Sequence, residues 1–279
     1  MRGHELLKPL LRAQLTRDEK QLLPRRWQIL GDLVLVNIPA KIEYLRYDIG
    51  EALLDLYPRC KSVLWDKGVG GNLRKPRVEV IAGSETTTIH KENYCKFALD
   101  ARRVMFSAGN FAERVRMSKV GNGEKVLDMF AGIGQFCVPM AVHGHPESIS
   151  AIELNSVAYN YLRQNVKLNH IEDIIQPRLG NCADVASDDQ FDRVLMGHFD
   201  AYDYLCRGIE ALVPSGIVHY HEIVPLELAF ERPPANVARA ARALSRTAQV
   251  LNVRKVKDYA PGIAHVVVDA RIHSAHASR

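Results

Sequence analysis

Long hydrophobic runs are missing from this sequence, and so is any grouping of cysteines. No stretch of about 18 consecutive apolar residues occurs, so we expect no membrane-spanning helix. The opening segment MRGHELLKPLLRAQLTRDEK carries a charge every few positions, which is unlike a secretory signal. The five cysteines (Cys60, Cys95, Cys137, Cys182 and Cys206) include no CxxC pair, which argues against a disulfide framework or a zinc site. These absences favour a reduced, cytoplasmic setting.

Internal repeats, low-complexity tracts and a strong charge imbalance are also absent. With 47% hydrophobic and 25% charged residues, the 279-residue chain has an ordinary globular composition and room for two domains. The net charge of +5 suits a polyanionic partner better than an acidic chain would, but it does not decide the partner.

The first third of the chain reads as short helices followed by a small α/β module. Leucines at helical spacing over residues 5–23 predict short helices broken by Pro9 and Pro24. Residues 46–58 predict a further helix. Strands are predicted at residues 32–39, 62–68, 77–83 and 86–100. We expect residues 1–96 to form an N-terminal domain that helps to dock a nucleic acid.

The remaining residues, 97–279, read as a second α/β domain with a different pattern. Strand-like runs at 125–130, 148–153, 191–197 and 216–224 alternate with helical stretches such as 156–169. This alternation predicts a parallel, doubly wound sheet. Residues 248–273 read as two long strands joined around Pro261-Gly262, so an antiparallel hairpin closes the sheet. A parallel sheet with a reversed last strand is the shape of the Rossmann-like class I S-adenosylmethionine-dependent transferases.

The segment LDMFAGIGQF (127–136) is typical of a nucleotide-binding loop. Gly132 and Gly134 follow a predicted strand and precede a helix, where a β-carbon would block the approach of a ligand to the backbone. The third glycine of a full GxGxxG motif is replaced by Cys137. Taken alone, this glycine pair also fits a plain tight turn.

Two carboxylates narrow the choice of cofactor. Asp128 ends the strand before Gly132, where it would repel a pyrophosphate but attract an ammonium group. Glu153 ends the next strand, a position from which a carboxylate accepts hydrogen bonds from ribose hydroxyls. NAD enzymes share the second feature, whereas S-adenosylmethionine satisfies both. The sequence therefore favours S-adenosylmethionine over NAD.

The third strand of this series is expected to end near RLGNCADV (178–185). Asn181 or Asp184 would then lie near the adenine, although either side chain could instead cap the loop. The sulfonium activates three different carbons of S-adenosylmethionine, and the pose of the cofactor decides which is attacked. The loop alone therefore does not identify the group that is transferred.

Three further stretches resemble one enzyme family. FSAGNFAERVRMSKV (106–120), DRVLMGHF (192–199) and YAPGIAHVVVDARI (259–272) are similar to the archaeal tRNA wybutosine-synthesising protein 2 family, which is related to the tRNA guanine-N1 methyltransferases. The resemblance spans about residues 25–275. It implies transfer of the 3-amino-3-carboxypropyl group of S-adenosylmethionine to 4-demethylwyosine beside the anticodon of tRNA(Phe), with release of methylthioadenosine. The alternative is methyl transfer to a tRNA guanine.

The resemblance also implies roles for single residues. Ser107 and Arg114 would contact the methionine moiety, since an arginine fork suits a carboxylate. Glu153 would hold the ribose, and Asn181 and Cys182 would lie against the adenine. Without the resemblance, Ser107 could simply begin a turn and Arg114 could pair with a surface acid.

The end of the fourth strand distinguishes this chain from the methyltransferase relatives. They resemble N-x-P there, whereas this chain has Met196-Gly197-His198. Met196 and Gly197 provide no side-chain amide for a guanine edge, and we expect the glycine to leave space that fits a bulkier base or a differently placed cofactor tail. Alkylation of carbon must release a proton, and His198 and Glu222 are candidate acceptors.

Basic residues predict the contacts with tRNA phosphates. The segment 98–119 contains Arg102, Arg103, Arg114, Arg116 and Lys119, and the small domain adds Arg25, Arg26, Arg74, Lys75 and Arg77. Tyr202 and Tyr204 could stack on a splayed-out base or pack internally.

A metal site and two other functions compete with this interpretation. His219 and His221 share one face of a strand but have no third ligand nearby, so we expect no metal. An NAD-dependent oxidoreductase and a catalytically silent RNA-binding module remain rival functions. No obligate protein partner is evident.

Overall fold

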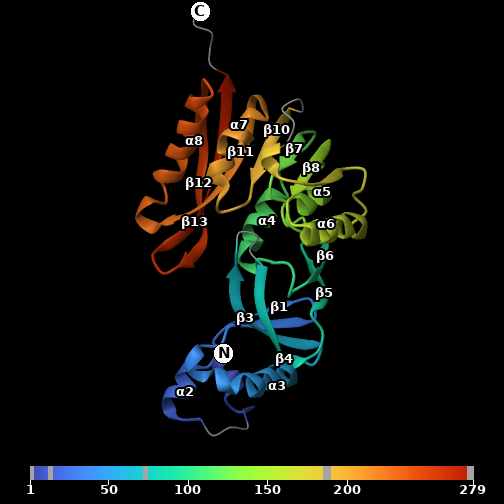
Figure 1. Cartoon of the computed structure of the whole chain (residues 1–279), viewed down its shortest axis with the longest axis vertical. Coiled ribbons are helices and arrows are strands. Elements are labelled where there is room, and N and C mark those ends of the chain that lie inside the picture. Colours follow the sequence, from blue (N-terminus) through green and yellow to red (C-terminus); the bar gives the residue numbers. More distant parts are fainter. Residues whose placement is uncertain (1–2, 12–14, 72–74, 185–189, 275–279) are drawn as a thin grey trace, which may run out of the picture. The chain divides into compact units, whose positions relative to one another are not determined.

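The computed structural model describes residues 3–11, 15–71, 75–184 and 190–274, and the chain divides into two compact units. Unit 1 comprises Met1–Ala108 and unit 2 comprises Gly109–Arg279, both shown in Figure 1. The sequence placed this division after residue 96. No helix of the described residues is long and apolar enough to cross a membrane.

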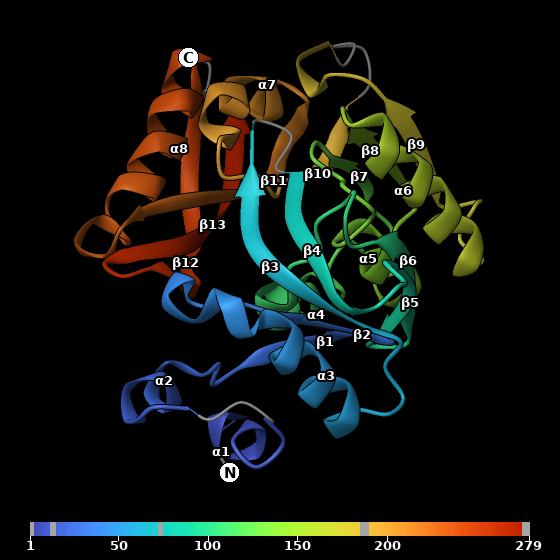
Figure 2. The same cartoon turned by 60° about the horizontal axis from the view of Figure 1, so that its bottom comes forward.

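Unit 1 is a small sheet with helices packed on one face. Its elements are α1 (Gly3–Leu7), α2 (Arg17–Leu22), β1 (Trp27–Leu30), β2 (Leu33–Val36), η1 (Ala40–Leu45), α3 (Arg46–Leu56), β3 (Ser62–Gly70), β4 (Lys75–Gly83), β5 (Thr87–Glu92) and β6 (Cys95–Asp100). The first four strands form a sheet in the order β1-β2-β3-β4, and only the β2–β3 pair is parallel. Leu53 of α3 and Val34 of β2 belong to one buried core, on the helical face visible in Figure 2.

One predicted strand of unit 1 is two strands. Residues 86–100 form the antiparallel pair β5 and β6 rather than a single strand. The chain reverses at Asn93 and Tyr94, whose φ angles are 45° and 59°. Two consecutive positive φ angles are characteristic of the tight turns that close hairpins. The alternating pattern continues across this turn, so the pattern by itself does not reveal the break between the two strands.

Unit 2 is a seven-stranded sheet flanked by helices. Its elements are η2 (Ala108–Asn110, beginning at the last residue of unit 1), α4 (Phe111–Met117), β7 (Lys125–Asp128), α5 (Cys137–His143), β8 (Ser148–Glu153), α6 (Ser156–Leu168), β9 (Ile175–Leu179), η3 (Cys182–Asp184), β10 (Phe191–Met196), η4 (Ala201–Tyr204), α7 (Leu205–Glu210), β11 (Leu212–Pro225), η5 (Leu226–Leu228), α8 (Arg232–Ala243), β12 (Arg246–Ala260) and β13 (Ile263–Ser274). The strand order is β12-β13-β11-β10-β7-β8-β9. Both pairings of β13 are antiparallel, whereas the five strands from β11 to β9 are mutually parallel.

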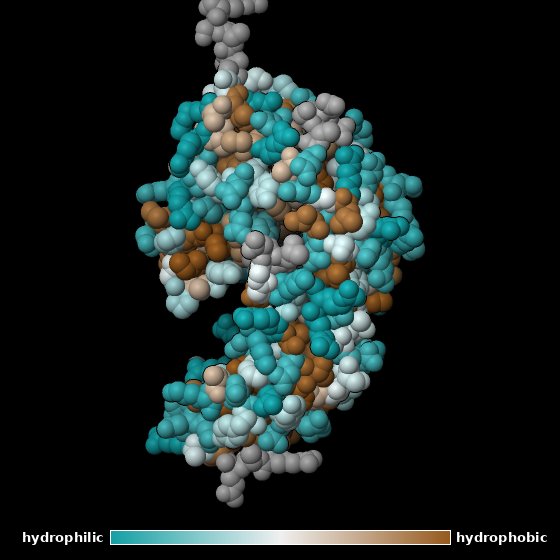
Figure 3. All heavy atoms as spheres, in the orientation of Figure 1, coloured by the Kyte–Doolittle hydropathy of each residue, from teal (hydrophilic) through white to brown (hydrophobic). Residues whose placement is uncertain are grey.

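This topology confirms the predicted Rossmann-like fold with a reversed strand and a closing hairpin. The hairpin turns at Pro261-Gly262, where Gly262 has a φ of 73°. Helices α7 and α8 pack on one face of the sheet through a core that includes Ile209, Val237 and Tyr220. Where η5 and the turn of the β12–β13 hairpin lie, apolar side chains gather on the surface (Figure 3), and the exposed ones include Leu226 and Phe230.

Strand order places the site. The chain moves from β7 outward through β8 to β9, and then returns to the other side of β7 with β10. Ligands of open α/β sheets bind at such a reversal, beyond the carboxyl ends of the strands. A ligand site is therefore expected at the residues that follow β7 and β10.

Candidate active site

The loop after β7 is shaped by two glycines and anchored from α6. Gly132 and Gly134 have φ angles of 57° and 96°, a region that L side chains rarely adopt. A β-carbon on Gly134 would also lie 2.5 Å from Val138 Cγ2. The buried Asn165 of α6 donates its Nδ2–H to the carbonyl of Ile133 at 2.9 Å, which fixes the loop from behind.

Glu153 joins the end of β8 to this loop. Its Oε2 accepts the N–H of Gly132 at 2.7 Å, and its Oε1 accepts the N–H of Asn155 at 2.7 Å. Burial raises the pKa of Glu153, while these N–H donors lower it. A carboxylate oxygen accepts more than one hydrogen bond, so each oxygen retains acceptor capacity for a ribose hydroxyl.

Asp128 is the most deeply buried acid of the loop. Its Oδ1 accepts the N–H of Phe130 at 3.3 Å, whereas its buried Oδ2 has no hydrogen-bond partner within the described part of the chain. Burial raises the pKa of Asp128 to about 7, while the Phe130 N–H and the nearby Cys137 thiol lower it, the thiol without forming a hydrogen bond of normal geometry. A buried oxygen without a donor fits an incoming ammonium group. The residues present therefore fit S-adenosylmethionine.

In the loop after β9, the structure shows a capping role for Asn181, which was one of its two predicted alternatives. Strand β9 ends at Leu179, close to where the sequence placed its end. Asn181 caps the loop, because its Oδ1 accepts the N–H of Ala183 at 3.0 Å. Cys182 is buried in the sheet core, and burial raises its pKa to about 11. The roles of Asn181 and Cys182 beside an adenine stay predictions.

The space expected beside Gly197 is filled. A β-carbon on Gly197 would lie 2.9 Å from Cε2 of Phe136, the last residue of the LDMFAGIGQF segment. Met196 is fully buried, and its sulfur lies near Gly208 of α7 in the core. The interpretation that the glycine leaves room for a bulkier base is thus wrong. The small residue instead accommodates an aromatic ring of the protein.

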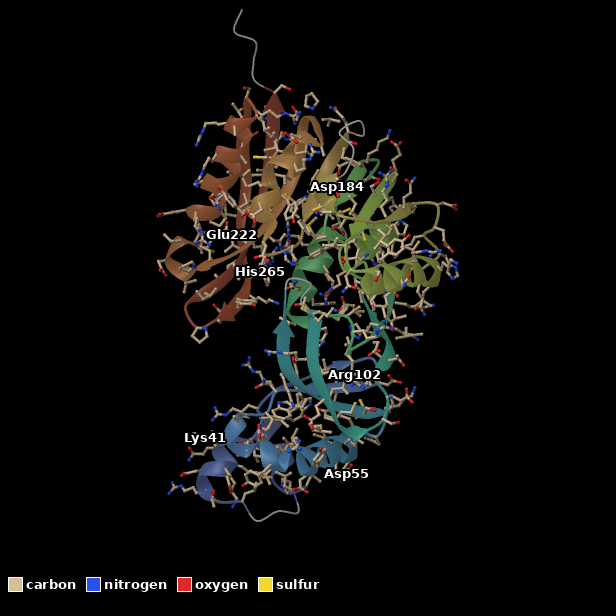
Figure 4. The ribbon with its side chains drawn as sticks, in the orientation of Figure 1. Lys41, Asp55, Arg102, Asp184, Glu222 and His265 are labelled. Atoms are coloured by element: carbon tan, nitrogen blue, oxygen red, sulfur yellow. The ribbon has the colours of Figure 1, made fainter. Side chains whose placement is uncertain are left out.

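The two candidate proton acceptors lie in contrasting surroundings. Glu222 is buried and accepts hydrogen bonds from Arg232 Nε (2.7 Å), Asn236 Nδ2 (3.0 Å) and Tyr220 Oη (3.0 Å). It lies on the α8 side of β11 (Figure 4), so the structure does not support it as a proton acceptor. His198 follows β10 and is stacked on Phe130, with ring centroids 5.3 Å apart.

Helix α4 holds an arginine in the interior. Arg114 is 1% exposed, so it is not a surface residue. Its neighbour Glu113 pairs with Arg116, at 3.0 and 2.5 Å. Burial keeps Arg114 from a tRNA phosphate, whereas Arg116 is half-buried and engaged with Glu113 and Asp269, so its contact with a phosphate stays a prediction. Ser107 belongs to unit 1, which ends at Ala108.

Other basic residues keep their predicted exposure. Arg102 (Figure 4), Arg103 and Lys119 are exposed. Arg74 lies outside the described residues. These positions stay predictions as tRNA contacts.

A row of four polar side chains in unit 2, each in contact with the next, was not predicted from the sequence. Arg193 pairs with Glu124 at 2.5 and 2.9 Å, and His219 lies between Arg193 and Asp269 with contacts of 2.5 Å on each side. His221 instead faces His265, with Nδ1 and Nε2 2.9 Å apart. Within the described ranges, no group of three or more His, Cys, Asp or Glu side chains could hold a metal ion.

The sequence pattern indicated part of this row but not its contacts. The HYH pattern signalled that His219 and His221 share a strand face, but not that Asp269 lies opposite His219 on the neighbouring strand.

Comparison with known proteins identifies the family. The TRM5/TYW2 methyltransferase domain matches residues 88–251, and the TYW2 N-terminal domain matches residues 7–86. The chain belongs to the TRM5/TYW2 family. This confirms the family that the sequence motifs indicated. For the TRM5/TYW2 domain, the matched range includes β7, the glycine loop and the loop after β10.

Individual TRM5/TYW2 relatives carry two kinds of name. A Methanocaldococcus jannaschii protein named tRNA(Phe) (4-demethylwyosine(37)-C(7)) aminocarboxypropyltransferase is 39% identical over 88% of this chain and 97% of its own length. The tRNA (guanine(37)-N(1))-methyltransferase Trm5b of Pyrococcus abyssi is 30% identical over 91% of this chain and 76% of its own. A crystal structure of Pyrococcus horikoshii TYW2 in complex with MeSAdo superposes with a TM-score of 0.85 at 32% identity, covering 98% of this chain and 100% of that one.

Proposed function

We propose that this chain transfers the 3-amino-3-carboxypropyl group of S-adenosylmethionine to 4-demethylwyosine beside the anticodon of tRNA(Phe). The by-product is methylthioadenosine. The observation that carries the cofactor assignment is the buried, unpartnered Oδ2 of Asp128, next to a loop whose Gly132 is bound by Glu153. The nearly full-length similarity to the M. jannaschii aminocarboxypropyltransferase supports the choice of transferred group.

Each protein group has a defined task in this reaction. Glu153 holds the ribose hydroxyls, Asp128 holds the ammonium of the tail, and the buried Arg114 binds the tail carboxylate. The ammonium and the carboxylate are both bonded to the α-carbon, so Asp128 and Arg114 hold one end of the tail. Glu153 holds the ribose beyond the sulfonium, and together they present the sulfur-bonded carbon to the base. The carbon–sulfur bond breaks, a carbon–carbon bond to the base forms, and the base loses one proton. Sulfur leaves with its electron pair as neutral methylthioadenosine.

The same interpretation assigns a partner and a location. The partner is tRNA(Phe), contacted through exposed basic residues such as Arg102 and Lys119 of the segment 98–119, with unit 1 helping to dock it. The location is the cytoplasm, where the tRNA substrate is found.

A by-product assay tests the proposal. The protein is incubated with S-adenosylmethionine and tRNA(Phe) carrying 4-demethylwyosine, and the adenosine products are separated by mass spectrometry. We expect methylthioadenosine together with the matching mass increase of the tRNA. The same tRNA with an unmodified guanine serves as control and should give neither product.

A second candidate, methyl transfer to a tRNA guanine, is favoured by the similarity to Trm5b. S-adenosylhomocysteine as by-product, with methylation of the unmodified control tRNA, would establish it and overturn the aminocarboxypropyl proposal. Tight binding of NADH with no binding of S-adenosylmethionine would instead support the hypothesis of an NAD-dependent oxidoreductase.

A further inference from the structure

Helix α4 carries Arg114, the residue to which the proposed function assigns the carboxylate of S-adenosylmethionine. The helix has only seven residues, and a helix shorter than about 12 residues is marginal without tertiary contacts. Within the described residues, the side chain of Asn110 makes no capping hydrogen bond to the first turn. The place of Arg114 therefore depends on what anchors α4 to the rest of unit 2.

The strongest polar anchor of α4 is Arg116. Its Nη1 donates to Asp269 Oδ2 at 2.6 Å, and its Nη2 donates to Asp269 Oδ1 at 3.1 Å. Its Nε and Nη2 also donate to the two carboxylate oxygens of Glu113, at 3.0 and 2.5 Å. One guanidinium thus binds an acid of its own helix and an acid of β13. Charge-assisted contacts with this two-pronged geometry are strong and directional.

Asp269 is itself held by the neighbouring strands. Arg193 Nη1 lies 2.5 Å from His219 Nε2, and a guanidinium can only donate, so Nε2 accepts and carries no proton. The proton of the neutral ring is then on Nδ1, which donates to Asp269 Oδ1 at 2.5 Å. Glu124 accepts two hydrogen bonds from Arg193 in turn. The acid that receives Arg116 is therefore fixed from β11 and β10.

These contacts are largely shielded from water. The side chains of Glu113 and Asp269 are 1% and 9% exposed, and that of Arg116 is 21% exposed. Water therefore competes less for these hydrogen bonds than it does at an exposed ion pair. We call Glu113, Arg116 and Asp269 the α4 clamp.

The α4 clamp acts on only one of the three cofactor contacts of the proposed function. Arg114 and Arg116 are separated by a single residue of one short helix, so a shift of α4 moves both. Asp128 ends β7 and Glu153 ends β8, so neither belongs to α4. An arginine fork binds a carboxylate well only in a narrow range of geometries. A displaced α4 would therefore weaken the carboxylate contact and leave the ammonium and ribose contacts in place.

We propose that Arg116 and Asp269 are positioning residues for the cofactor, which set the place of the Arg114 guanidinium against the carboxylate of S-adenosylmethionine. This inference rests on the proposed function, in which Arg114 binds that carboxylate. Methylthioadenosine has no carboxylate, so the α4 clamp favours the intact cofactor over the product. The product is then released more readily once the tail has been transferred.

Three ligands separate the contacts. S-adenosylmethionine carries the ribose, the ammonium and the carboxylate, its decarboxylated analogue lacks only the carboxylate, and methylthioadenosine lacks the whole tail. Calorimetry gives the affinity of each ligand for the wild type and for the Arg116→Gln, Arg116→Lys and Asp269→Asn variants. Thermal melting establishes that each variant is folded at the temperature of the titration.

Arg239→Gln is the matched control. Arg239 is an exposed arginine of α8 that donates to Asn236 on its own helix at 2.8 Å, and it belongs to no cofactor contact. We expect this variant to bind all three ligands as the wild type does.

We expect Arg116→Gln to weaken S-adenosylmethionine binding about 10-fold, the lower end of the range for losing a hydrogen bond to a charged group. Affinity for the decarboxylated analogue and for methylthioadenosine should stay within twofold of wild type. Asp269→Asn should act in the same direction. Arg116→Lys should recover part of the loss, because lysine keeps the charge but lacks the planar fork that binds both acids.

Two results would overturn the positioning role and leave the proposed function standing. An equal loss of affinity for all three ligands in Arg116→Gln would show a general disturbance of the site. Unchanged S-adenosylmethionine affinity, with a raised KM for tRNA as the only defect, would assign Arg116 to a tRNA phosphate instead.

The proposed function can fail separately. The titrations contain no tRNA, so a wild-type protein that releases S-adenosylhomocysteine in the by-product assay fails that assay without changing the binding result. A wild type that binds S-adenosylmethionine and its decarboxylated analogue equally has no carboxylate contact. That result would overturn the role of Arg114 in the proposed function and the positioning role together.

Discussion

Arg116 of α4 and Asp269 of β13 form a two-pronged ion pair, with contacts of 2.6 and 3.1 Å between residues 153 positions apart. Arg116 also binds Glu113 on its own helix. Asp269 in turn contacts His219. The pair therefore ties the helix that carries Arg114 to β13, the strand next to the β12 edge of the sheet.

Asp269→Asn tests how far this tie stabilises unit 2. The substitution leaves Arg116 with Glu113 as its acidic partner and removes the charge that His219 contacts, and we expect a loss of about 2–3 kcal/mol in the free energy of unfolding. The exposed pair Lys255–Asp258 in β12 supplies the control. Asp258→Asn should lower that free energy by less than about 1 kcal/mol. Urea denaturation measures both, and equal effects would contradict a stabilising role for the buried pair.

Acid should destabilise the protein through its buried histidines. Burial lowers the pKa of His221 to about 3, and it also lowers the pKa of His219. The unfolded state binds a proton near pH 6.5 while the folded state does not, so stability falls as the pH drops from about 6.5 towards 3. His221→Gln should make this fall shallower without abolishing it, since His219 still titrates. Melting temperatures of both proteins are measured across this pH range. The same slope of melting temperature against pH in the variant and the wild type would contradict a contribution from His221.

Asp128 should make cofactor binding depend on pH. Its pKa is raised to about 7 by burial, so the carboxylate that attracts the ammonium is ionised mainly above pH 7. We expect the affinity for S-adenosylmethionine to rise with pH through this value and the Asp128→Asn variant to lose the rise. Methylthioadenosine has no ammonium group and should bind both proteins alike. Calorimetry with both ligands decides; an equal effect on methylthioadenosine would reject an ammonium contact.

Glu153→Ala should weaken binding of every adenosine ligand. The substitution removes the ribose acceptor and also leaves the N–H groups of Gly132 and Asn155 without their partner. The expected loss is about 1–3 kcal/mol of binding free energy, the usual effect of leaving polar groups unpaired. Glu153→Gln retains one acceptor oxygen and should lose less. Wild-type affinity in the alanine variant would exclude the ribose contact.

The local pattern of the sequence was sufficient for the sheet and for the loop beside it. Alternation of strands and helices predicted the parallel sheet, and Gly132 and Gly134 marked the loop because glycine adopts positive φ angles most readily. The positions of Asp128 and Glu153 at strand ends followed from the same pattern, since parallel strands bring their carboxyl ends to one edge. All of these are relations within a few residues, or between neighbouring strands.

Long-range packing decided the rest. No local signal shows that Asp269 would meet Arg116, that Glu222 would be occupied by Asn236 and Arg232 of α8, or that Phe136 would fill the space beside Gly197. The side-chain roles of His198 and Glu222 diverged for this reason: one follows a strand at the edge where ligands bind, and the other faces a helix. The sequence by itself determined the family, the fold and the cofactor loop. Only the tertiary structure decided which polar groups had a partner, because that depends on segments that meet across the whole unit.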